Sequence, residues 1–370
     1  MTDQLDLVLV NTPIGALGTG RGGGVELTLT SLTQGLVMRG HRLTVVAARG
    51  STLPADCCDV TLVEVDGIDQ PSWQHAAADQ TIVIPRHGLL PALWEVALNQ
   101  AQTADAVINA GYDWLPLWLT PWVKPPVFHL ISMGDVSDVM RETIEAVAGW
   151  DARRLAFHTR RQADDFRLPL PATVVGNGFD LSRYTMCSGK DGPLGWAGRI
   201  APEKGLEDAA AAAAALGERL LVWGLKENAA YADDVESQVP PGTINWRGFL
   251  PTAELQKELG TCRALINTPK WNEAYGNVVV EALACGVPVV AYDRGGPGEL
   301  IRSGETGWLV AADDVAALTQ ALREVGSIQR TRCREWVERH ATREVFSQRV
   351  ETWIREGLTM DGSINAENDS

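Results

Sequence analysis

The chain has 370 residues, of which 45% are hydrophobic and 21% are charged, and its formal net charge is −15 at pH 7. This length allows two domains with their own hydrophobic cores, and the composition is that of a globular protein. The negative charge argues against a nucleic acid partner, because a phosphate backbone would be repelled, but a small anion could still bind to a local group of basic residues.

We expect neither a membrane anchor nor an export signal. No apolar run reaches the roughly 18 residues of a membrane-spanning helix. The start, MTDQLDLVLVNTP, lacks the basic segment and the cleavage site of a secretory signal. The six cysteines are scattered and fit neither a zinc site nor a disulfide framework. We therefore expect a cytoplasmic protein with reduced thiols and no stable membrane association.

In the first half of the chain, apolar β-branched runs alternate with helical patterns. The pattern predicts a helix over 25–40 that ends at Gly40. The alternation of strands and helices predicts a parallel sheet with helices on both faces. The strands are expected at 5–10, 42–48, 81–84, 106–110 and 127–132.

The same alternation begins again after VVGNGFDLSRY (174–184), and a helix with seven consecutive alanines is predicted around 209–215. Two such α/β repeats, joined near residue 175, predict two α/β domains with a cleft between them. Ligands of open α/β sheets bind outside the carboxyl ends of the strands. The strands of the second repeat are expected within 192–200, 219–224, 243–250, 264–268 and 287–292.

The end of the chain is helical in pattern over 329–357, and its polar tail is expected to be disordered. These patterns predict one domain over 1–175, a second that begins at residue 176, and a disordered tail over 359–370.

A glycine-rich loop, NTPIGALGTGRGGGVE (11–26), follows the first strand. Gly18, Gly20 and Gly23 match the dinucleotide fingerprint G-x-G-x-x-G. The match is weak, since the glycines begin well after the strand and no acidic residue ends the second strand. Arg49 could instead meet a 2′-phosphate, so an NADP-dependent oxidoreductase remains an alternative. The loop favours a different interpretation, in which three consecutive glycines, including Gly23 and Gly24, let backbone approach a phosphate at the helix start.

Two basic residues stand just past the first strand of the second repeat, in GRIAPEKG (198–205). The planar guanidinium of Arg199 and the point charge of Lys204 suit one diphosphate, which the first would bind through two oxygens and the second would neutralise. Taken alone, the pair could equally be two solvated charges on a turn, with Glu203 as a surface partner.

The stretch PKWNEAYGNVVVEALACGVPVV (269–290) holds Glu273 and Glu281 eight residues apart. On one continuous helix they would lie ~12 Å apart and would not share a small target. If the helix begins near Gly276, Glu273 lies in the preceding loop and Glu281 inside the helix. The amide groups of residues 275–278 then favour an anion at the helix start. Phosphates bound there could present one sugar ring to each carboxylate, as a sugar nucleotide would.

These segments, together with SGETGWLV (303–310), resemble family-4 retaining glycosyltransferases of the GT-B fold. The matching motifs cover most of the chain in the family's order, and the combination of E-x7-E with R-x4-K is the specific part. The resemblance implies a UDP-sugar donor, with Arg199 and Lys204 on its diphosphate, Glu273 on its sugar and Glu281 on its ribose. It also implies two Rossmann-like domains facing across a cleft, an acceptor-binding one over 1–175 with 340–358 and a donor-binding one over 176–339. The C-terminal helix would cross back to the first domain.

The resemblance also places His129, in VFHLIS (127–132), near the anomeric carbon, although a lone histidine at a strand end is more often a core residue. The catalytic set that it implies is His129, Glu273, Arg199 and Lys204. The implied donor-binding set is Gly23, Gly24, Arg199, Lys204, Glu273, Ala274, Tyr275, Gly276, Asn277, Val278 and Glu281.

Within this family, the start NTPIGALGTGRGGGVELTL is similar to cyanobacterial UDP-glucose:tetrahydrobiopterin glucosyltransferases. Residues 1–175 contain 12 Lys and Arg against 19 Asp and Glu, a charge that anionic membranes would repel. The tryptophans of GYDWLPLWLTPW (111–122) could offer an aromatic wall to a flat, small soluble acceptor such as a pterin, or could simply be core and turn packing.

No D-x-D triple occurs in the chain, so we expect a metal-independent enzyme without cofactor, in which the basic residues stabilise the leaving diphosphate. A non-catalytic sugar-nucleotide sensor is the third possibility, against which the intact set of charged residues argues.

Overall fold

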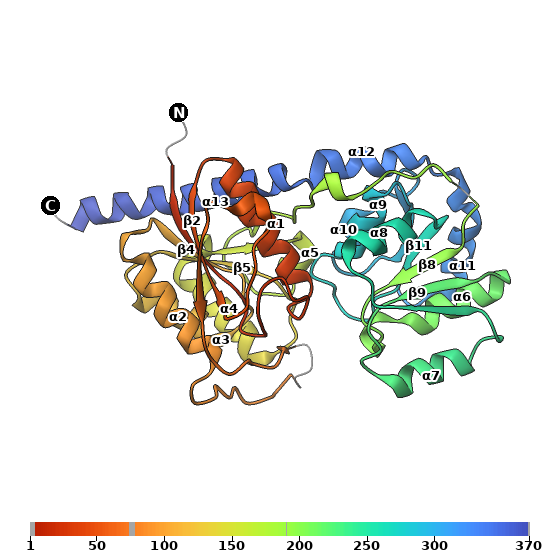
Figure 1. Ribbon diagram of the computed structural model, residues 1–370, viewed down its shortest axis with the longest axis horizontal. Helices are drawn as coiled ribbons and strands as arrows, with labels where there is room; N and C mark the ends of the chain where they lie inside the picture. Colours follow the sequence, from red (N-terminus) through yellow and green to blue (C-terminus); the bar gives the residue numbers. More distant parts are fainter. Residues whose placement is uncertain (1–3, 74–77, 190, 369–370) are drawn as a thin grey trace. The chain divides into compact units, whose positions relative to one another are not determined.

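The computed structural model describes residues 4–73, 78–189 and 191–368 (Figure 1). The chain forms two compact units: unit 1 comprises residues 1–178 and 343–370, and unit 2 comprises residues 179–342. The sequence placed the two junctions after residues 175 and 339, slightly earlier than they lie. Each unit is an α/β fold built on its own parallel sheet.

Unit 1 contains a seven-stranded parallel sheet in the order β3-β2-β1-β4-β5-β6-β7. Strand β1 lies in the middle of the sheet. Strands β2 and β3 follow on one side of it, and β4 to β7 follow on the other side. The point between β1 and β4 is therefore the topological switch point, where loops diverge and ligands of such sheets bind. The strands are β1 (Asp6–Val10), β2 (Arg42–Ala48), β3 (Thr61–Val65), β4 (Ala106–Asn109), β5 (Val127–Ile131), β6 (Leu155–Phe157) and β7 (Thr173–Val174).

Both faces of this sheet are covered by helices, because side chains of successive strand residues point to opposite faces. Leu7 and Leu9 share a core with α1 and α13, whereas Val8 and Val10 share a core with α2. Helices α1 and α13 pack against each other (Figure 1). The helices of unit 1 are α1 (Gly24–Met38), α2 (Leu89–Gln100), α3 (Trp114–Leu119), α4 (Asp138–Asp151), α5 (Arg160–Ala163) and α13 (Arg343–Asn368).

Unit 2 contains a six-stranded parallel sheet in the order β10-β9-β8-β11-β12-β13. Its switch point lies between β8 and β11, for the same topological reason as in unit 1. The strands are β8 (Leu194–Ala197), β9 (Leu220–Trp223), β10 (Ile244–Gly248), β11 (Ala264–Asn267), β12 (Val289–Tyr292) and β13 (Gly307–Val310).

The second sheet is also covered on both faces. Val289 and Ala291 of β12 belong to a core with α8, α9, α10 and α12, whereas Val290 and Tyr292 belong to a core with α6, α7 and α11. The predicted polyalanine helix is confirmed as α6, and its small side chains let it pack closely on the sheet. The helices are α6 (Leu206–Leu216), α7 (Ala229–Ser237), α8 (Thr252–Gly260), α9 (Asn277–Ala284), α10 (Pro297–Leu300), α11 (Val315–Glu324) and α12 (Arg330–His340).

Two local predictions were wrong. Residues 81–84 form no strand; the place beside β2 is taken by β3, whose alternating TLVEV pattern the sequence analysis overlooked. The tail was expected to be disordered from residue 359, but α13 continues to Asn368, and residues 369–370 lie outside the described part of the chain. This helix is anchored upstream by buried Phe346, Val350 and Trp353, so each further turn only extends hydrogen bonds already begun.

Among the described residues, no helix is both long enough and apolar enough to cross a bilayer.

Candidate functional site

The loop from β8 to α6, residues 198–205, carries Arg199 and Lys204 at the switch point of unit 2. It packs directly on the segment that follows β11. Gly205 has φ +64°, and a Cβ atom there would lie 2.0 Å from the carbonyl oxygen of Thr268. Only glycine allows this approach, so the two loops of the switch point are held against each other.

The loop from β11 to α9, residues 268–276, carries Trp271 and Glu273. The helix begins at Asn277 with Gly276 as its N-cap, which confirms the helix start expected from the sequence. A third loop, which follows β12, supports this one. Gly296 donates its N–H to the Glu273 carbonyl at 2.6 Å, and a Cβ atom on Gly296 would lie 2.1 Å from the Tyr275 carbonyl oxygen.

Arg199 and Lys204 both lie against one indole ring. The Lys204 ammonium is 4.7 Å, and the Arg199 guanidinium 6.0 Å, from the centroid of the Trp271 ring. Lys204 Nζ also forms an ion pair with Glu273 Oε2 at 2.5 Å, and Trp271 Nε1 donates to the same oxygen at 3.1 Å. The structure therefore brings together Arg199, Lys204 and Glu273, and it adds Trp271, which the sequence analysis missed although it lies two residues before Glu273.

Both cations are paired with carboxylates in this structure. Arg199 pairs with Glu203 at 2.7 Å and with Glu227 at 2.8 Å. Burial alone raises the pKa of the Glu273 carboxyl, but the charge and hydrogen bond of Lys204, helped by Trp271 and Arg199, outweigh burial and hold that pKa below its ordinary value. Glu273 is therefore ionised at neutral pH, and an anion that binds here must exchange partners with these carboxylates.

Glu281 lies one turn inside α9 and away from this cluster. It is 6% exposed, and its Oε1 accepts a hydrogen bond from the Tyr184 hydroxyl at 3.1 Å. Burial raises the pKa of Glu281 to about 7, and Tyr184 offsets only part of that rise. The predicted role of Glu281 on a ribose is untested, and it would require a ligand to displace or join Tyr184.

The segment between the two glutamates presents backbone to the start of α9. Ala274, Asn277 and Val278 are partly buried, whereas Tyr275 and Gly276 are buried. The Tyr275 ring stacks on Phe179, with centroids 6.5 Å apart, which fixes the loop from the side of the core. The first amides of a helix have no acceptor within the helix and carry a partial positive charge, so this start favours an anion.

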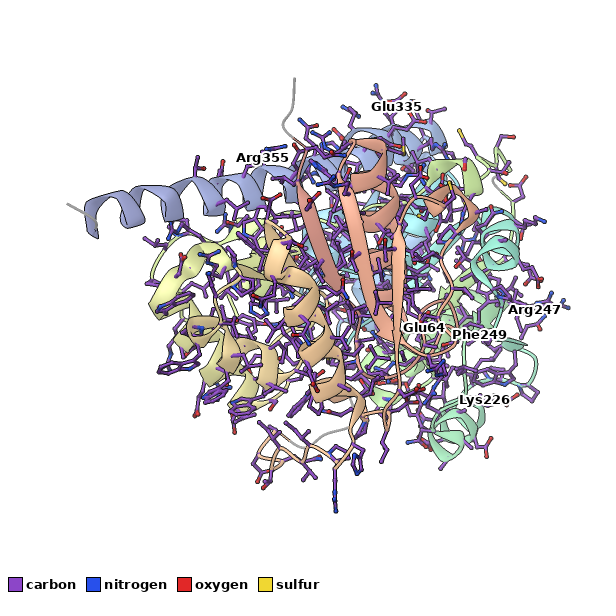
Figure 2. All side chains as sticks on the ribbon, turned by 60° about the vertical axis from the view of Figure 1, so that its left-hand side comes forward. Glu64, Lys226, Arg247, Phe249, Glu335 and Arg355 are labelled. Carbon is purple, nitrogen blue, oxygen red and sulfur yellow. The ribbon has the colours of Figure 1, made fainter. Side chains whose placement is uncertain are left out.

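An apolar surface lies beside Arg199 at the carboxyl ends of β9 and β10. Leu225 is 54% exposed and Phe249 is 59% exposed. Their backbones are neighbours, because Gly224 N–H donates to the Gly248 carbonyl at 2.9 Å, and the Leu225 carbonyl in turn accepts from Ile200. Figure 2 shows Phe249 and Lys226 at this edge of unit 2.

In unit 1, the glycine loop is folded around a carboxylate. Glu26, in the first turn of α1, is 6% exposed, and it accepts hydrogen bonds from the amides of three residues of the loop. Gly23 and Gly24 are exposed at the helix start, with φ +56° at Gly23. The sequence assigned this loop to a phosphate, but a side chain of the chain itself already occupies much of its amide surface. The donor amides are Gly18 N at 2.8 Å, Gly20 N at 3.0 Å and Gly22 N at 2.6 Å.

His129 is a buried core histidine in this structure, which was the alternative to a catalytic role. It lies on β5 and has no exposed surface. Its Nδ1 accepts from Asn109 Nδ2 at 3.0 Å, and its Nε2 lies 2.7 Å from Thr120 Oγ1, whose own proton goes to the Pro116 carbonyl. Burial, with Arg154 nearby, lowers the pKa of His129 to about 3, so the ring is neutral and carries its proton on Nε2.

Comparison with known proteins identifies the second unit by sequence. Residues 190–342 match the family described as Glycosyl transferases group 1. The glycogen synthase of Mycobacterium tuberculosis is 33% identical over 163 residues, which cover 41% of this chain and 39% of that protein. The D-inositol 3-phosphate glycosyltransferase of Rhodococcus erythropolis is 33% identical over 196 residues, which cover 46% and 43%. The matches thus span about two-fifths of the length of these curated relatives.

Solved structures share the fold over nearly the whole chain at low identity. Sucrose-phosphate synthase from Thermosynechococcus elongatus has a TM-score of 0.76 at 16% identity, covering 96% of this chain and 100% of its own. AviGT4, a glycosyltransferase involved in avilamycin A biosynthesis, has a TM-score of 0.73 at 20% identity, and the match covers 96% of this chain and 98% of AviGT4. HepE from Anabaena, solved with UDP and glucose, has a TM-score of 0.69 at 16% identity, and the match covers 95% of this chain and 100% of HepE. The chain therefore has the GT-B fold of two Rossmann-like units, and its residues 190–342 form a glycosyl transferases group 1 domain.

Proposed function

We propose that the protein is a retaining glycosyltransferase that moves a hexose, glucose first among the candidates, from a UDP-sugar to a hydroxyl group of a small soluble acceptor such as tetrahydrobiopterin. The observation that carries the proposal is the cluster of Arg199, Lys204, Trp271 and Glu273 at the switch point of unit 2. Two cations and a carboxylate there lie next to a helix start that favours an anion.

The comparisons support a sugar nucleotide as the donor. The matched relatives are named as glycosyltransferases and as a glycogen synthase, and HepE, which shares the fold, was solved with UDP and glucose. The exposed Leu225 and Phe249 offer apolar side chains to a nucleobase beside Arg199. The choice of glucose and of uracil rests on these likenesses and on the resemblance seen in the sequence.

In the proposed reaction, the bond from the anomeric carbon to the diphosphate breaks while the acceptor oxygen bonds to the same face of the sugar. Lys204, Arg199 and the first amides of α9 stabilise the negative charge that develops on the leaving diphosphate. Glu273 accepts hydrogen bonds from sugar hydroxyls, once the phosphate has drawn Lys204 away from it. The leaving phosphate takes the proton of the acceptor hydroxyl, so no side chain acts as a covalent nucleophile.

We further propose that these cations do the work that a metal ion does in other transferases. Within the described ranges, no group of three or more His, Cys, Asp and Glu side chains could hold a metal ion. Activity measured after exhaustive treatment with a chelator checks this part, and a loss restored by Mg²⁺ or Mn²⁺ would contradict it.

The direct experiment is incubation with UDP-glucose and a panel of acceptors that includes tetrahydrobiopterin, followed by mass spectrometry of the products. A product heavier than its acceptor by one hexose, with release of UDP, supports the proposal. Thermal stabilisation by NADP but not by UDP would favour an oxidoreductase instead. Binding of UDP-glucose without any transfer or hydrolysis would indicate a sugar-nucleotide sensor.

A further inference from the structure

The guanidinium group of Arg199 is held by two carboxylates of the chain itself. Its Nη1 donates a hydrogen bond to Glu227 Oε2 at 2.8 Å. Its Nη2 lies 2.7 Å from Glu203 Oε1, close enough for an ion pair, yet this buried nitrogen forms no hydrogen bond. Glu227 is therefore the better directed of the two partners, and one donor nitrogen of Arg199 still lacks an acceptor.

Glu227 comes from the segment that follows β9, and backbone hydrogen bonds fix this segment beside Arg199. The Leu225 carbonyl accepts from Ile200 N–H at 2.9 Å and from Glu227 N–H at 3.0 Å. Asn228 N–H in turn donates to the Ile200 carbonyl at 3.4 Å. Because Ile200 directly follows Arg199 in the chain, these bonds keep the carboxylate within reach of the guanidinium group, so that it can return there whenever a bound anion leaves.

Carboxylates outnumber cations in this cluster. Arg199 and Lys204 lie among three glutamates, so the formal charge of the group is negative; the glutamates are Glu203, Glu227 and Glu273. Within the described part of the chain, Arg199 is the one cation that pairs with Glu227. When Arg199 turns to a phosphate, Glu227 loses this ion pair and faces an anion at short range. The Glu227 charge therefore opposes the binding of a diphosphate.

The opposition is stronger for the product of sugar transfer than for the donor. In a sugar nucleotide, the ester to the sugar blocks the terminal phosphate, and each phosphate keeps a single negative charge. Transfer frees the terminal phosphate, which takes the acceptor proton and, with a second pKa of about 6, releases it at neutral pH. Free UDP thus carries more negative charge than the donor. The carboxylate of Glu227 repels it more strongly, at the step of product release that limits turnover in many enzymes.

We propose that Glu227 competes with the diphosphate for Arg199, so that it weakens nucleotide binding and speeds the release of UDP after sugar transfer. This inference rests on the proposed function for the identity of the anion as UDP, whereas the competition itself needs only a diphosphate. Glu227 then acts against the ligand and favours donor over product. A glutamate that bound the hydroxyl groups of the nucleotide would have the opposite effect on affinity.

Isothermal titration of the whole chain carrying Glu227→Gln tests the inference. The amide keeps the shape of the side chain and removes its charge, so the Kd for UDP should fall roughly fivefold, as expected when one partly exposed ion pair no longer competes. The Kd for UDP-glucose should fall less, and UDP dissociation measured by stopped flow should slow. A Kd for UDP that is unchanged or raised overturns the inference, as does a larger gain for UDP-glucose than for UDP.

A matched control is available on α12 of the same unit. Glu335 also forms an ion pair with an arginine, Arg332, at 3.1 Å. Figure 2 shows Glu335 well separated from Lys226, the chain neighbour of Glu227. Glu335→Gln makes the same change in net charge, and its Kd for UDP should equal that of the wild type. An equal fall of the Kd in both variants would mean that affinity follows the net charge of the protein, and would overturn the inference.

Inorganic pyrophosphate, titrated into the wild type and the same variants, separates this inference from the proposed function. It carries the diphosphate without a nucleoside, so Glu227→Gln should bind it more tightly as well. Tighter binding of UDP and pyrophosphate by this variant, in a protein that transfers no hexose, would contradict the proposed function and leave the inference standing. Hexose transfer without a gain of affinity in Glu227→Gln would do the reverse, and wild-type protein that binds neither ligand would overturn both.

Discussion

The switch points of the two units have the same topology and opposite chemistry. In unit 2, Arg199 and Lys204 are about one-fifth exposed and each is paired with a carboxylate. In unit 1, the corresponding place holds Asp113, buried, without a cation, and bonded only to neutral donors. The parallel sheet therefore decides where a ligand can bind, and the loops decide whether the ligand meets charge or hydrogen-bond acceptors.

The first loops of the two units differ in the same way. After β1, the loop turns its amides onto Glu26, a carboxylate of the chain itself. After β8, the loop instead carries Arg199 and Lys204, which lie against Trp271. A loop already filled by its own anion is a rigid structural element, whereas a loop whose partly buried cations are paired with carboxylates can exchange those partners for a ligand.

Removal of the Glu26 carboxylate should have the largest effect of the changes considered, and the effect should be on the stability of the glycine loop. Glu26→Ala leaves the amides of Gly18, Gly20 and Gly22 without their acceptor, at a cost of about 3 kcal/mol in unfolding free energy, roughly 1 for each hydrogen bond. Urea denaturation of the variant against Glu95→Ala, an exposed carboxylate on α2, measures it. Equal stability of the two variants would mean that Glu26 is a surface charge and not the centre of the loop.

Loss of Lys204 should come next, and it should affect turnover more than stability. Lys204→Ala removes one charge-assisted hydrogen bond to the leaving diphosphate. The loss of transition-state stabilisation should be about 2 kcal/mol, so kcat/KM with UDP-glucose should fall roughly 30-fold. Lys257→Ala, at an exposed position on α8, has the same change of charge and should behave as wild type. An unchanged kcat/KM in Lys204→Ala would remove unit 2 from the chemistry.

The pH dependence of the unfolding free energy tests whether Asp113 in unit 1 lacks a compensating charge. Between the ordinary aspartate pKa of 3.8 and about 7, folded Asp113 keeps a proton that the unfolded chain has released, so a rise in pH lowers the unfolding free energy. Glu281 acts in the same direction. Asp113→Asn should reduce this slope by up to about 1.4 kcal/mol per pH unit. Unfolding curves of both proteins at pH 5, 6 and 7 give the slopes, and parallel slopes would show that Asp113 is ionised throughout.

The smallest effect is expected from Trp271→Phe. The change keeps an aromatic ring beneath Lys204 but removes the indole N–H that donates to Glu273. The loss of transition-state stabilisation should be only about 0.5 to 1 kcal/mol, so kcat/KM should fall a few-fold. Trp308→Phe on β13 serves as the control, since its indole N–H has no partner. A loss as large as that of Lys204→Ala would mean that Trp271 touches the reacting sugar and is not merely a support.

Much of the fold was accessible from the sequence because its signals are local. The buried strands, the glycine that starts α9 and the alanine-rich α6 all follow from periodicity and propensity over short stretches. The short strand β6 and the edge strand β7 were missed, since three or two residues carry no readable period. The run at 81–84 was predicted as a strand because it is apolar and β-branched. Such a stretch becomes a strand only where it pairs with a neighbouring strand of the sheet.

For the candidate site, the sequence alone determined the residue types and their order: two cations after one strand, a glutamate and a helix start after another, and glycines where backbones approach. Tertiary structure decided the rest, because hydrogen bonds and burial join residues far apart in the chain. It placed Trp271 beneath both cations, enclosed His129, and left Asp113 without a compensating charge. No spacing in the sequence encodes these partners, since each depends on which side chain the folded sheets bring within about 3 Å of another.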